Sequence, residues 1–368
     1  MLAAETILQR LTELLPTERF RVLNVCGGHE RAISRSGLRT MLDHNIELIP
    51  GPGCPVCICP EEDIATAISI AIQNDVILLS FGDMLRVPIY QTSCAFHSLQ
   101  DAKSHGADIQ PIASPLEVLS IAHQNPDKRV VFFAVGFETT MAPIAAMLLQ
   151  DIPDNVSILL SGRLTWPAVS YLLKDNSNSF DALIAPGHVA TVMGIDEWKF
   201  VADDYHLPIA VAGFHPESLL LALHSLLEQK SLNKYTLSNC YQELVKSTGN
   251  AHAQACIWST MRLVDANWRG IGVIPDSGLV LRPELKHLDA HRHFDIAIPD
   301  KTSAELPPGA LCSEVVMGKQ VPTDCPLYGN ACTPRTAVGA CMVSDEGACR
   351  IWWSTVQDGR PVKARVIK

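Results

Sequence analysis

Three cysteines lie within six residues in the stretch 51-GPGCPVCIC-59, which is crowded with glycine and proline. The Cys-x-x-Cys pair of Cys54 and Cys57 can close a small disulfide or supply half of a metal site. Pro60 suits the first position of a helix, so we expect the pair on a stiff turn before a helix N-terminus. The helix dipole there favours thiolates, although the acidic residues at 61–63 oppose this effect.

Another cysteine precedes two glycines, a histidine and an acidic residue in 26-CGGHE-30. The two glycines allow the backbone to approach another group closely. Cys26 and His29 are a soft ligand pair suited to iron or zinc, or a nucleophile with its base. The residues alone leave these alternatives open, together with that of an ordinary turn.

The C-terminal part contains a cysteine-rich stretch, 325-CPLYGNACTPRTAVGACMVSDEGAC-349. Four thiols in one loop-rich segment can hold a 4Fe-4S cluster or a zinc ion. The gaps are longer than in common zinc ribbons and differ from the bacterial ferredoxin pattern. The residue chemistry favours a metal centre over free thiols, with iron–sulfur ahead of zinc. The candidate ligands are Cys325, Cys332, Cys341 and Cys349.

Two more polar residues follow buried apolar runs, Glu138 in 136-GFETT-140 and His188 in 186-PGHV-189. Glu138 is a candidate acid, base or orienting group. His188 is a candidate ligand or proton carrier, and each residue also fits an ordinary structural role. The sequence contains no Walker A or dinucleotide-binding glycine pattern, so it gives no support for ATP or NAD.

The composition is that of a well-buried globular protein, with 368 residues, 47% hydrophobic and 18% charged. The net charge of −10 argues against a nucleic-acid partner. The longest apolar runs, such as 130-VVFFAVGF-137, are too short to span a membrane. Residues 1–15 predict an amphipathic helix and not a signal peptide, so we expect a cytoplasmic protein. Its twelve cysteines then indicate metal or redox chemistry rather than a disulfide framework.

Short apolar runs that end in glycine alternate with helical stretches, which predicts an α/β fold with parallel sheets. We expect two α/β lobes with thioredoxin- or Rossmann-like layering, plus a third, irregular iron–sulfur domain. The first lobe would span residues 1–120, with its N-terminal helix packing on the third domain. The second lobe would span 121–245, and the third domain 246–368.

Ligands of open parallel sheets bind beyond the carboxyl ends of the strands. The polar residues that follow the predicted strands all lie at such ends. If both lobes direct these ends at one cleft, seven side chains would meet there. They are Cys26, His29, Cys54, Cys57, Asp83, Glu138 and His188.

The sequence resembles the HypD family of nickel–iron hydrogenase maturation factors over nearly its whole length. The matching stretches are 26-CGGHE-30, 51-GPGCPVC-57, 81-FGDMLRVP-88, 134-AVGFETT-140, 186-PGHV-189, 268-WRGIGVIPDSGL-279, 325-CPLYGNACTP-334 and 340-ACMVSDEGAC-349. Several of them are long and peculiar to the family.

The resemblance implies an assembly scaffold rather than an enzyme that converts a free metabolite. With a small HypC-type chaperone, it would hold one iron while two cyanides and one carbon monoxide are attached. A HypE-type partner would donate the cyanide, and the hydrogenase large subunit would be served indirectly. Cys26 would bind the iron jointly with a cysteine of the chaperone, and His29 would lie beside it.

The same resemblance implies that Cys54 and Cys57 are a redox couple and that the four C-terminal cysteines hold a 4Fe-4S cluster. Glu138 and His188 match family positions at the same central cleft. The alternatives are a general thiol–disulfide oxidoreductase with an iron–sulfur cluster, and a zinc-stabilised α/β protein with structural thiols.

The chain departs from the family pattern at several positions. Arg31 replaces a usual histidine, Cys59 a usual threonine, Ile89 a usual glycine and His215 a usual glutamate. A family C-x-C-G stretch keeps only Cys312. Arg31 beside the expected iron site would affect the binding of an anion such as cyanide.

Overall fold

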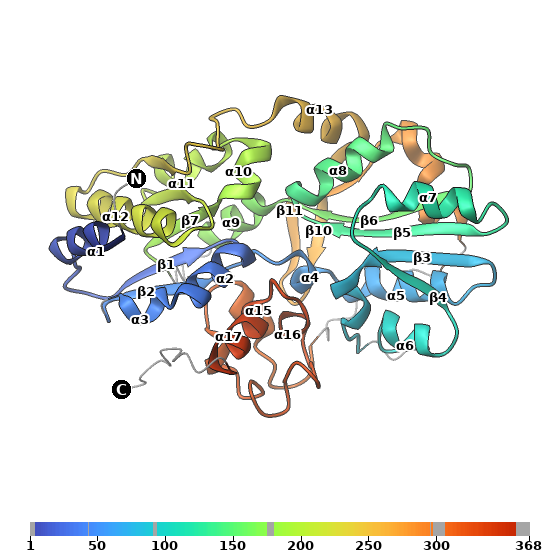
Figure 1. Ribbon diagram of the computed structural model, residues 1–368, viewed down its shortest axis with the longest axis horizontal. Coiled ribbons are helices and arrows are strands. Elements are labelled where there is room, and N and C mark those ends of the chain that lie inside the picture. Colours follow the sequence, from blue (N-terminus) through green and yellow to red (C-terminus); the bar gives the residue numbers. More distant parts are fainter. Residues whose placement is uncertain are drawn as a thin grey trace.

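A computed structural model describes residues 4–42, 44–90, 94–174, 180–294, 296 and 306–357. Two α/β lobes lie side by side, and the C-terminal segment lies below and between them (Figure 1). Each lobe is built on one sheet whose central strands are short, buried apolar runs. Such strands are typical of sheets covered by helices on both faces. The predicted α/β class with mostly parallel sheets is therefore confirmed.

The first sheet has five parallel strands in the order β2-β1-β7-β8-β9. They are β1 (Phe20–Asn24), β2 (Ile46–Pro50), β7 (Ala182–Pro186), β8 (Ile209–Ala212) and β9 (Leu237–Cys240). The helices between these strands are α2 (Gly27–Ser36), α3 (Leu38–Met41), α10 (Gly187–Met193), α11 (Lys199–Asp203) and α12 (Pro216–Leu232), with the 3-10 turn η2 (Asp196–Trp198).

The second sheet has six strands in the order β10-β11-β6-β5-β3-β4. Strands β3 (Val76–Phe81), β4 (Asp108–Ile112), β5 (Arg129–Gly136) and β6 (Val156–Arg163) are parallel, and the antiparallel hairpin of β10 (Met261–Trp268) and β11 (Gly272–Leu281) extends them. The helices of this lobe are α4 (Pro55–Ile58), α5 (Glu61–Ala71), α6 (Leu99–Ser104), α7 (Glu117–Gln124), α8 (Glu138–Leu148), α9 (Thr165–Lys174), α13 (Ala251–Thr260) and α14 (Ala290–His293), with the 3-10 turns η1 (Gly82–Arg86) and η3 (Pro283–Leu288).

The pairing of strands differs from the contiguous lobes expected at 1–120 and 121–245. Strands β1 and β2 pair with β7, whereas β3 and β4 pair with β5 and β6. Each sheet therefore takes strands from both halves of the chain. Local periodicity identifies strands, but their neighbours are chosen by long-range packing, which no local pattern contains.

The expected third domain, 246–368, is also divided differently. Helix α13 and the hairpin β10–β11 belong to the second lobe. Residues 306–357 contain only short elements before a longer last helix: α15 (Cys312–Val316), the 3-10 turn η4 (Pro322–Asp324), α16 (Ala340–Val343) and α17 (Ala348–Gln357). We call residues 306–357 the tail.

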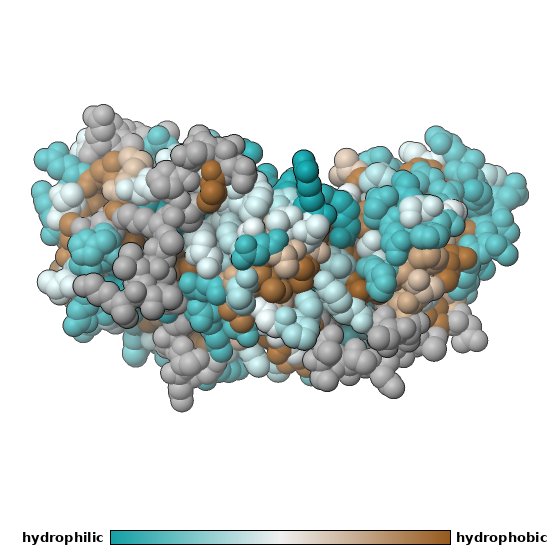
Figure 2. Space-filling view, turned by 90° about the horizontal axis from the view of Figure 1, so that it is seen from below, coloured by the Kyte–Doolittle hydropathy of each residue, from teal (hydrophilic) through white to brown (hydrophobic). Residues whose placement is uncertain are grey.

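The helix α1 (Ala4–Glu13) packs against α12 of the first lobe and not on the tail as expected. Figure 2 views the molecule from the side of the tail and shows a described surface that mixes hydrophilic and apolar residues. Among the described residues, no helix is long and apolar enough to cross a bilayer.

The two sheets share one hydrophobic core. Leu23 of β1 and Ile49 of β2 belong to the same buried cluster as Leu79 of β3 and Phe132 of β5. The lobes are therefore packed against each other, which fixes the relative positions of the loops that follow β1, β2 and β3.

Candidate functional site

Cys26 lies directly beyond the carboxyl end of β1 and is the N-cap residue of α2. The loop after β2 closes onto it, and the Gly27 N–H donates a hydrogen bond to the Gly53 carbonyl at 3.1 Å. A Cβ atom at Gly53 would lie only 2.4 Å from the Cys26 Cα and N atoms. The glycine of the GPG sequence is therefore needed for this close approach.

Cys54 and Cys57 form a disulfide. They lie in the one-turn helix α4, where Cys54 is the N-cap residue and Pro55 the first helical residue. The pair is therefore part of a short helix of its own rather than of a simple turn. Helix α5 begins at Glu61 with Pro60 as its N-cap residue, one position later than expected.

The disulfide and Cys26 line one small pocket, which we call the disulfide cavity. It lies where the loops after β1 and β2 meet the tail. Both half-cystines are buried, with 6% and 5% of their surfaces exposed, so only small groups reach them through this space. The lining also includes Glu30, Val315, Cys341, Glu346 and Ala348.

Glu346 of the tail lies against Gly27, and the sequence motifs did not single it out. A Cβ atom at Gly27 would lie 2.6 Å from the Glu346 carbonyl oxygen. Burial and, to a lesser degree, the Glu346 carboxylate raise the pKa of the Cys26 thiol, and the backbone N–H groups of His29 and Gly28 lower it, with a net pKa of about 12. The thiol therefore stays protonated at neutral pH.

The acidic residue of the CGGHE motif joins α2 to the tail. Glu30 is 2% exposed, and its Oε2 atom accepts hydrogen bonds from Asn24 Nδ2 at 3.0 Å and Arg39 Nη2 at 2.7 Å. Its Oε1 atom accepts one from Trp352 Nε1 of α17 at 2.6 Å. The Arg39 guanidinium also lies over the Trp352 ring, 4.8 Å from its centroid. Glu30 therefore anchors the wall of the disulfide cavity.

The two candidate histidines contact the same phenylalanine. The Phe214 ring centroid lies 4.8 Å from that of His29 and 3.8 Å from that of His188. His29 is fully buried, with Nε2 2.9 Å from the Ala212 carbonyl oxygen, and its Nδ1 atom has no hydrogen-bond partner among the residues that the structure describes. Burial lowers the pKa of His29 to about 4, so Nε2 carries the proton and Nδ1 is free to accept one.

His188 is exposed, and partial burial lowers its pKa. Neither His29 nor His188 is among the described residues that line the disulfide cavity. The two imidazoles lie on the β8 side of α2, next to that cavity rather than within it.

Glu138 begins α8 at the end of β5 and is fully buried. Its Oε1 atom accepts hydrogen bonds from the Thr165 N–H at 2.7 Å and the Thr165 hydroxyl at 3.0 Å. Burial raises the pKa of Glu138 to about 7, and its Oε2 atom has no partner among the described residues. Glu138 lines neither cavity described here.

Asp83 accepts hydrogen bonds from Ser344 Oγ and from the Asp345 N–H, each at 3.0 Å. It therefore ties the second lobe to the tail loop that carries Glu346. Of the seven side chains expected to meet in one cleft, the three cysteines line the same cavity and Asp83 supports its tail wall.

The four C-terminal cysteines line a second small pocket, which we call the tail cavity. Cys312 lines it as well, so five thiols face this space. The Val338 N–H donates to Cys332 Sγ at 3.4 Å. The side-chain hydrogen bond with Cys341 and burial together raise the pKa of Cys349 well above its usual range.

The tail cavity is lined by soft sulfur donors from separate parts of the tail. Among the described residues, no three His, Cys, Asp or Glu side chains are grouped to hold one metal ion. Thiolates are the ligands of both zinc and 4Fe-4S centres, so the chemistry of this donor set is compatible with either.

Cys341 lines both the disulfide cavity and the tail cavity. It belongs to α16, which packs against α4 and its disulfide. The two thiol-containing regions, far apart in the sequence, are therefore neighbours in the fold. A family model described as "HypD: Hydrogenase formation hypA family" matches residues 2–356.

The chain belongs to the HypD family of hydrogenase maturation factors.

Individual relatives support the same assignment over most of the chain. Hydrogenase maturation factor HypD of Escherichia coli (strain K12) is 43% identical over 338 residues, which cover 90% of this chain and 88% of the relative. HypD2 of Bradyrhizobium diazoefficiens is 38% identical over 349 residues, which cover 92% of this chain and 90% of the relative. HypD of Azotobacter vinelandii is 37% identical over 348 residues, again with 92% and 90% covered. The predicted family is confirmed.

The four residues expected to depart from the family pattern, Arg31, Cys59, Ile89 and His215, lie in different surroundings. Arg31 donates from Nη2 to the Asp345 carbonyl at 2.5 Å and so reaches the loop of Glu346. Cys59 is fully buried, with its sulfur 3.7 Å from Ser161 Oγ. Ile89 is buried, and His215 is the exposed N-cap residue of α12.

Proposed function

We propose that this protein is the scaffold on which, with a small HypC-type chaperone, the Fe(CN)2CO group of a nickel–iron hydrogenase is assembled. The observation that carries the proposal is the meeting of Cys26, the Cys54–Cys57 disulfide and Cys341 around one cavity. This arrangement supports the proposal, because a soft thiol ligand lies next to a Cys-x-x-Cys disulfide and next to a thiol of the tail cavity.

Iron is the cargo, and Cys26 is its ligand on this chain. The half-buried thiol loses its proton when the cation binds, which couples iron binding to proton release. Glu346 adds negative charge beside the site and favours a cation there. The chaperone supplies a second cysteine ligand, and the finished group passes from it to the hydrogenase large subunit.

Cyanide comes from a HypE-type partner that carries it as a thiocyanate. Cleavage of the carbon–sulfur bond consumes two electrons and one proton, and yields cyanide and a thiol on the partner. The Cys54–Cys57 dithiol provides two electrons and two protons as it closes to the disulfide, so one proton is left over. The cyanide then binds the iron at Cys26.

Reopening of the disulfide takes up two electrons and two protons. A 4Fe-4S cluster, when bound, supplies electrons singly at this position. Its ligands on this chain are Cys325, Cys332, Cys341 and Cys349, which all line the tail cavity. Cys341 is the ligand nearest the couple, because it borders the disulfide cavity as well.

His29 and Glu138 have roles that follow from their free polar atoms. His29 is neutral and presents Nδ1 as a proton acceptor behind Cys26. The Phe214 ring packs against the rings of both His29 and His188. Glu138 can hold or release a proton near pH 7 while it fixes the start of α9 at Thr165. We place this assembly in the cytoplasm, where a reducing environment keeps free thiols available.

The alternative is a general thiol–disulfide oxidoreductase with the same cluster. The 5–6% exposure of the half-cystines favours the scaffold, because a protein disulfide as substrate needs an exposed attacking thiol.

The test is an infrared spectrum of the protein purified anaerobically after co-expression with its host's maturation proteins. Bands of iron-bound cyanide and carbonyl are expected in the wild type and in the control Cys240→Ala, whose thiol lines neither cavity. They are expected to vanish in Cys26→Ala while the absorption of the cluster remains. Absence of these bands from a wild-type preparation that contains both chaperone and cluster would overturn the proposal.

A further inference from the structure

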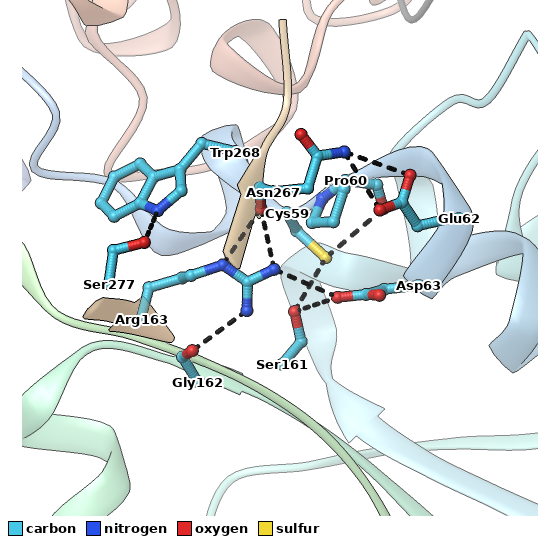
Figure 3. A network of polar contacts seen from close by, with 10 residues as sticks. All are labelled: Cys59, Pro60, Glu62, Asp63, Ser161, Gly162, Arg163, Asn267, Trp268 and Ser277. Atoms are coloured by element: carbon cyan, nitrogen blue, oxygen red, sulfur yellow. Dashed lines mark hydrogen bonds and ion pairs between the residues drawn. The ribbon is translucent and has the colours of Figure 1, made fainter. Parts of the chain in front are cut away.

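The acidic start of α5, just after the disulfide, is held by partners from the second lobe. Both carboxylate oxygens of Glu62 accept from Asn267 Nδ2, at 3.0 and 3.1 Å (Figure 3). Asp63 Oδ2 accepts from Ser161 Oγ at 2.5 Å and lies 3.5 Å from Arg163 Nη2. The carboxylates that would disfavour nearby thiolates are thus engaged by polar groups at the ends of β6 and β10.

The third carboxylate of this turn pairs with Arg269, from the WRGIGVIPDSGL stretch. Glu61 Oε1 lies 2.8 Å from Arg269 Nη2, and the two side chains are 3% and 2% exposed. The Arg269 N–H donates to the carbonyl of Ile58, the last residue of α4, at 2.9 Å. Its Nη2 atom also donates to the Pro88 carbonyl at 2.6 Å. Arg269 therefore contacts both the helix of the disulfide and the helix that follows.

The guanidinium has donor atoms to spare. Its Nε and Nη1 atoms are buried and have no partner among the described residues. A buried cation with unfilled donors interacts strongly with negative charge that forms nearby, because the local dielectric constant is low.

We propose that Arg269 is a positioning residue for the Cys54–Cys57 couple. The positive charge of Arg269 and the opposing negative charge of Glu61 together set the equilibrium between the dithiol and the disulfide. The inference rests on the proposed function in one respect, namely that this pair is reduced and oxidised in the working cycle. Reduction breaks the S–S bond with two electrons and takes up two protons to give the dithiol, or one proton to give a thiol and a thiolate. A fixed cation stabilises the thiolate form of the product and so favours reduction, whereas a fixed carboxylate opposes it.

A series of charge variants separates this effect from a purely structural one. Glu61→Gln removes the negative charge beside Arg269, and Arg269→Gln removes the positive one. The double variant removes both charges. Arg269→Lys keeps the positive charge but replaces the planar guanidinium and its fixed donors with a single ammonium group. Arg21→Gln is the matched control, since Arg21 pairs with Glu47 at 3.1 Å on the first sheet.

The readout is the equilibrium of the folded protein with oxidised and reduced dithiothreitol, which is the probe reductant. Samples are quenched with acid, alkylated after unfolding and digested with trypsin. The tryptic peptide 40–86 contains Cys54, Cys57 and Cys59 and no internal lysine or arginine before its end. It takes up one alkyl group when the pair is oxidised and three when the pair is reduced.

We expect Arg269→Gln to lower the equilibrium constant for reduction about tenfold and Glu61→Gln to raise it by a similar factor. The double variant, Arg269→Lys and Arg21→Gln are expected to stay near the wild type. If Arg269→Gln does not fold, Glu61→Gln and the double variant are compared instead. The Cys54–Cys57 pair should then be reduced more readily in Glu61→Gln than in the double variant.

Equal constants for Glu61→Gln and the double variant would overturn the inference, as would an unchanged constant in folded Arg269→Gln. Such results would leave the proposed function intact, because the pair would still cycle. A wild-type pair that stays oxidised at every ratio of dithiothreitol would instead contradict the redox role itself. The infrared bands of iron-bound cyanide and carbonyl test the scaffold function separately from the charge effect and from the redox role.

Discussion

The two thiol-lined cavities are built in different ways. The disulfide cavity is formed by residues that directly follow β1 and β2, and its wall is anchored by Glu30, Asn24 and Arg39. The tail cavity is lined by loops, by the short helices α15 and α16 and by the start of α17, within residues 310–349. Regular strands hold the first cavity in place, whereas the second has few backbone hydrogen bonds to regular elements. We infer that the first forms with the fold and that the second depends on a bound centre.

The strongest test of this difference is Cys341→Ala, since Cys341 lines both cavities. We expect loss of the cluster absorption near 400 nm, roughly the usual region for such centres, and unfolding of the tail at lower temperature. The two sheets should keep their far-ultraviolet circular dichroism. Retention of a full cluster would show that Cys312 replaces Cys341 as a ligand.

Acid is expected to act on the first lobe through His29. Its pKa is lowered to about 4 in the folded protein from 6.5, so the unfolded chain binds the extra proton first as pH falls. The stability that neutral His29 contributes is complete above pH 6.5 and is lost as pH falls to about 4. The expected loss in the free energy of unfolding is about 3 kcal/mol. Urea unfolding between pH 7 and 4 measures it.

The matched variant for this test is His29→Gln, which keeps a donor for the Ala212 carbonyl and cannot titrate. Its unfolding free energy should depend less steeply on pH between 6.5 and 4. The same slope in variant and wild type would show that another group is responsible.

Gly53→Ala should disturb the disulfide cavity alone. The added Cβ atom would lie 2.4 Å from backbone atoms of Cys26, which cannot move without shifting the end of β1. We expect a loss of about 2 kcal/mol in stability and weaker iron binding, with normal cluster absorption. Gly82→Ala is the control, because no atom of the described residues, apart from Gly82 and its two neighbours in the chain, lies within 4 Å of a Cβ atom there. Equal effects of the two substitutions would contradict the close approach.

The smallest expected effect is that of Glu30→Gln. The amide can still accept from Trp352 Nε1, but it loses the charge-assisted bond to Arg39. We expect a loss of about 1.5 kcal/mol and a change in Trp352 fluorescence, because α17 is held less firmly. An unchanged free energy of unfolding would mean that Arg39 finds an equivalent partner.

The elements of both lobes could largely be predicted from the sequence. Continuous apolar runs that end in glycine, such as 130–136, predicted buried strands, and α5, α9 and α12 lie where helical periodicity placed them. The arrangement of strands could not be predicted, because β1 joins β7 across more than a hundred residues of the other lobe. Local patterns carry no information about such pairing.

The candidate site was predicted unevenly for a similar reason. The cysteines were identified from their types and spacing, since thiols on Gly- and Pro-rich turns have few structural uses. Glu346 and the Glu61–Arg269 pair were missed, because a carboxylate or guanidinium becomes notable only when its partners and burial are known. Glu346 had one weak signal, its place in the same motif as Cys349.

The sequence by itself determined the chemistry available to this protein: which thiols exist, which of them lie on stiff turns, and which family motifs surround them. Only the tertiary structure decided which thiols share a space. The reason is physical: a residue type sets what an atom can bind, whereas proximity arises from long-range packing of strands and helices that are distant in the chain. Cys341 acquired its position between the two cavities only when α16 packed against α4.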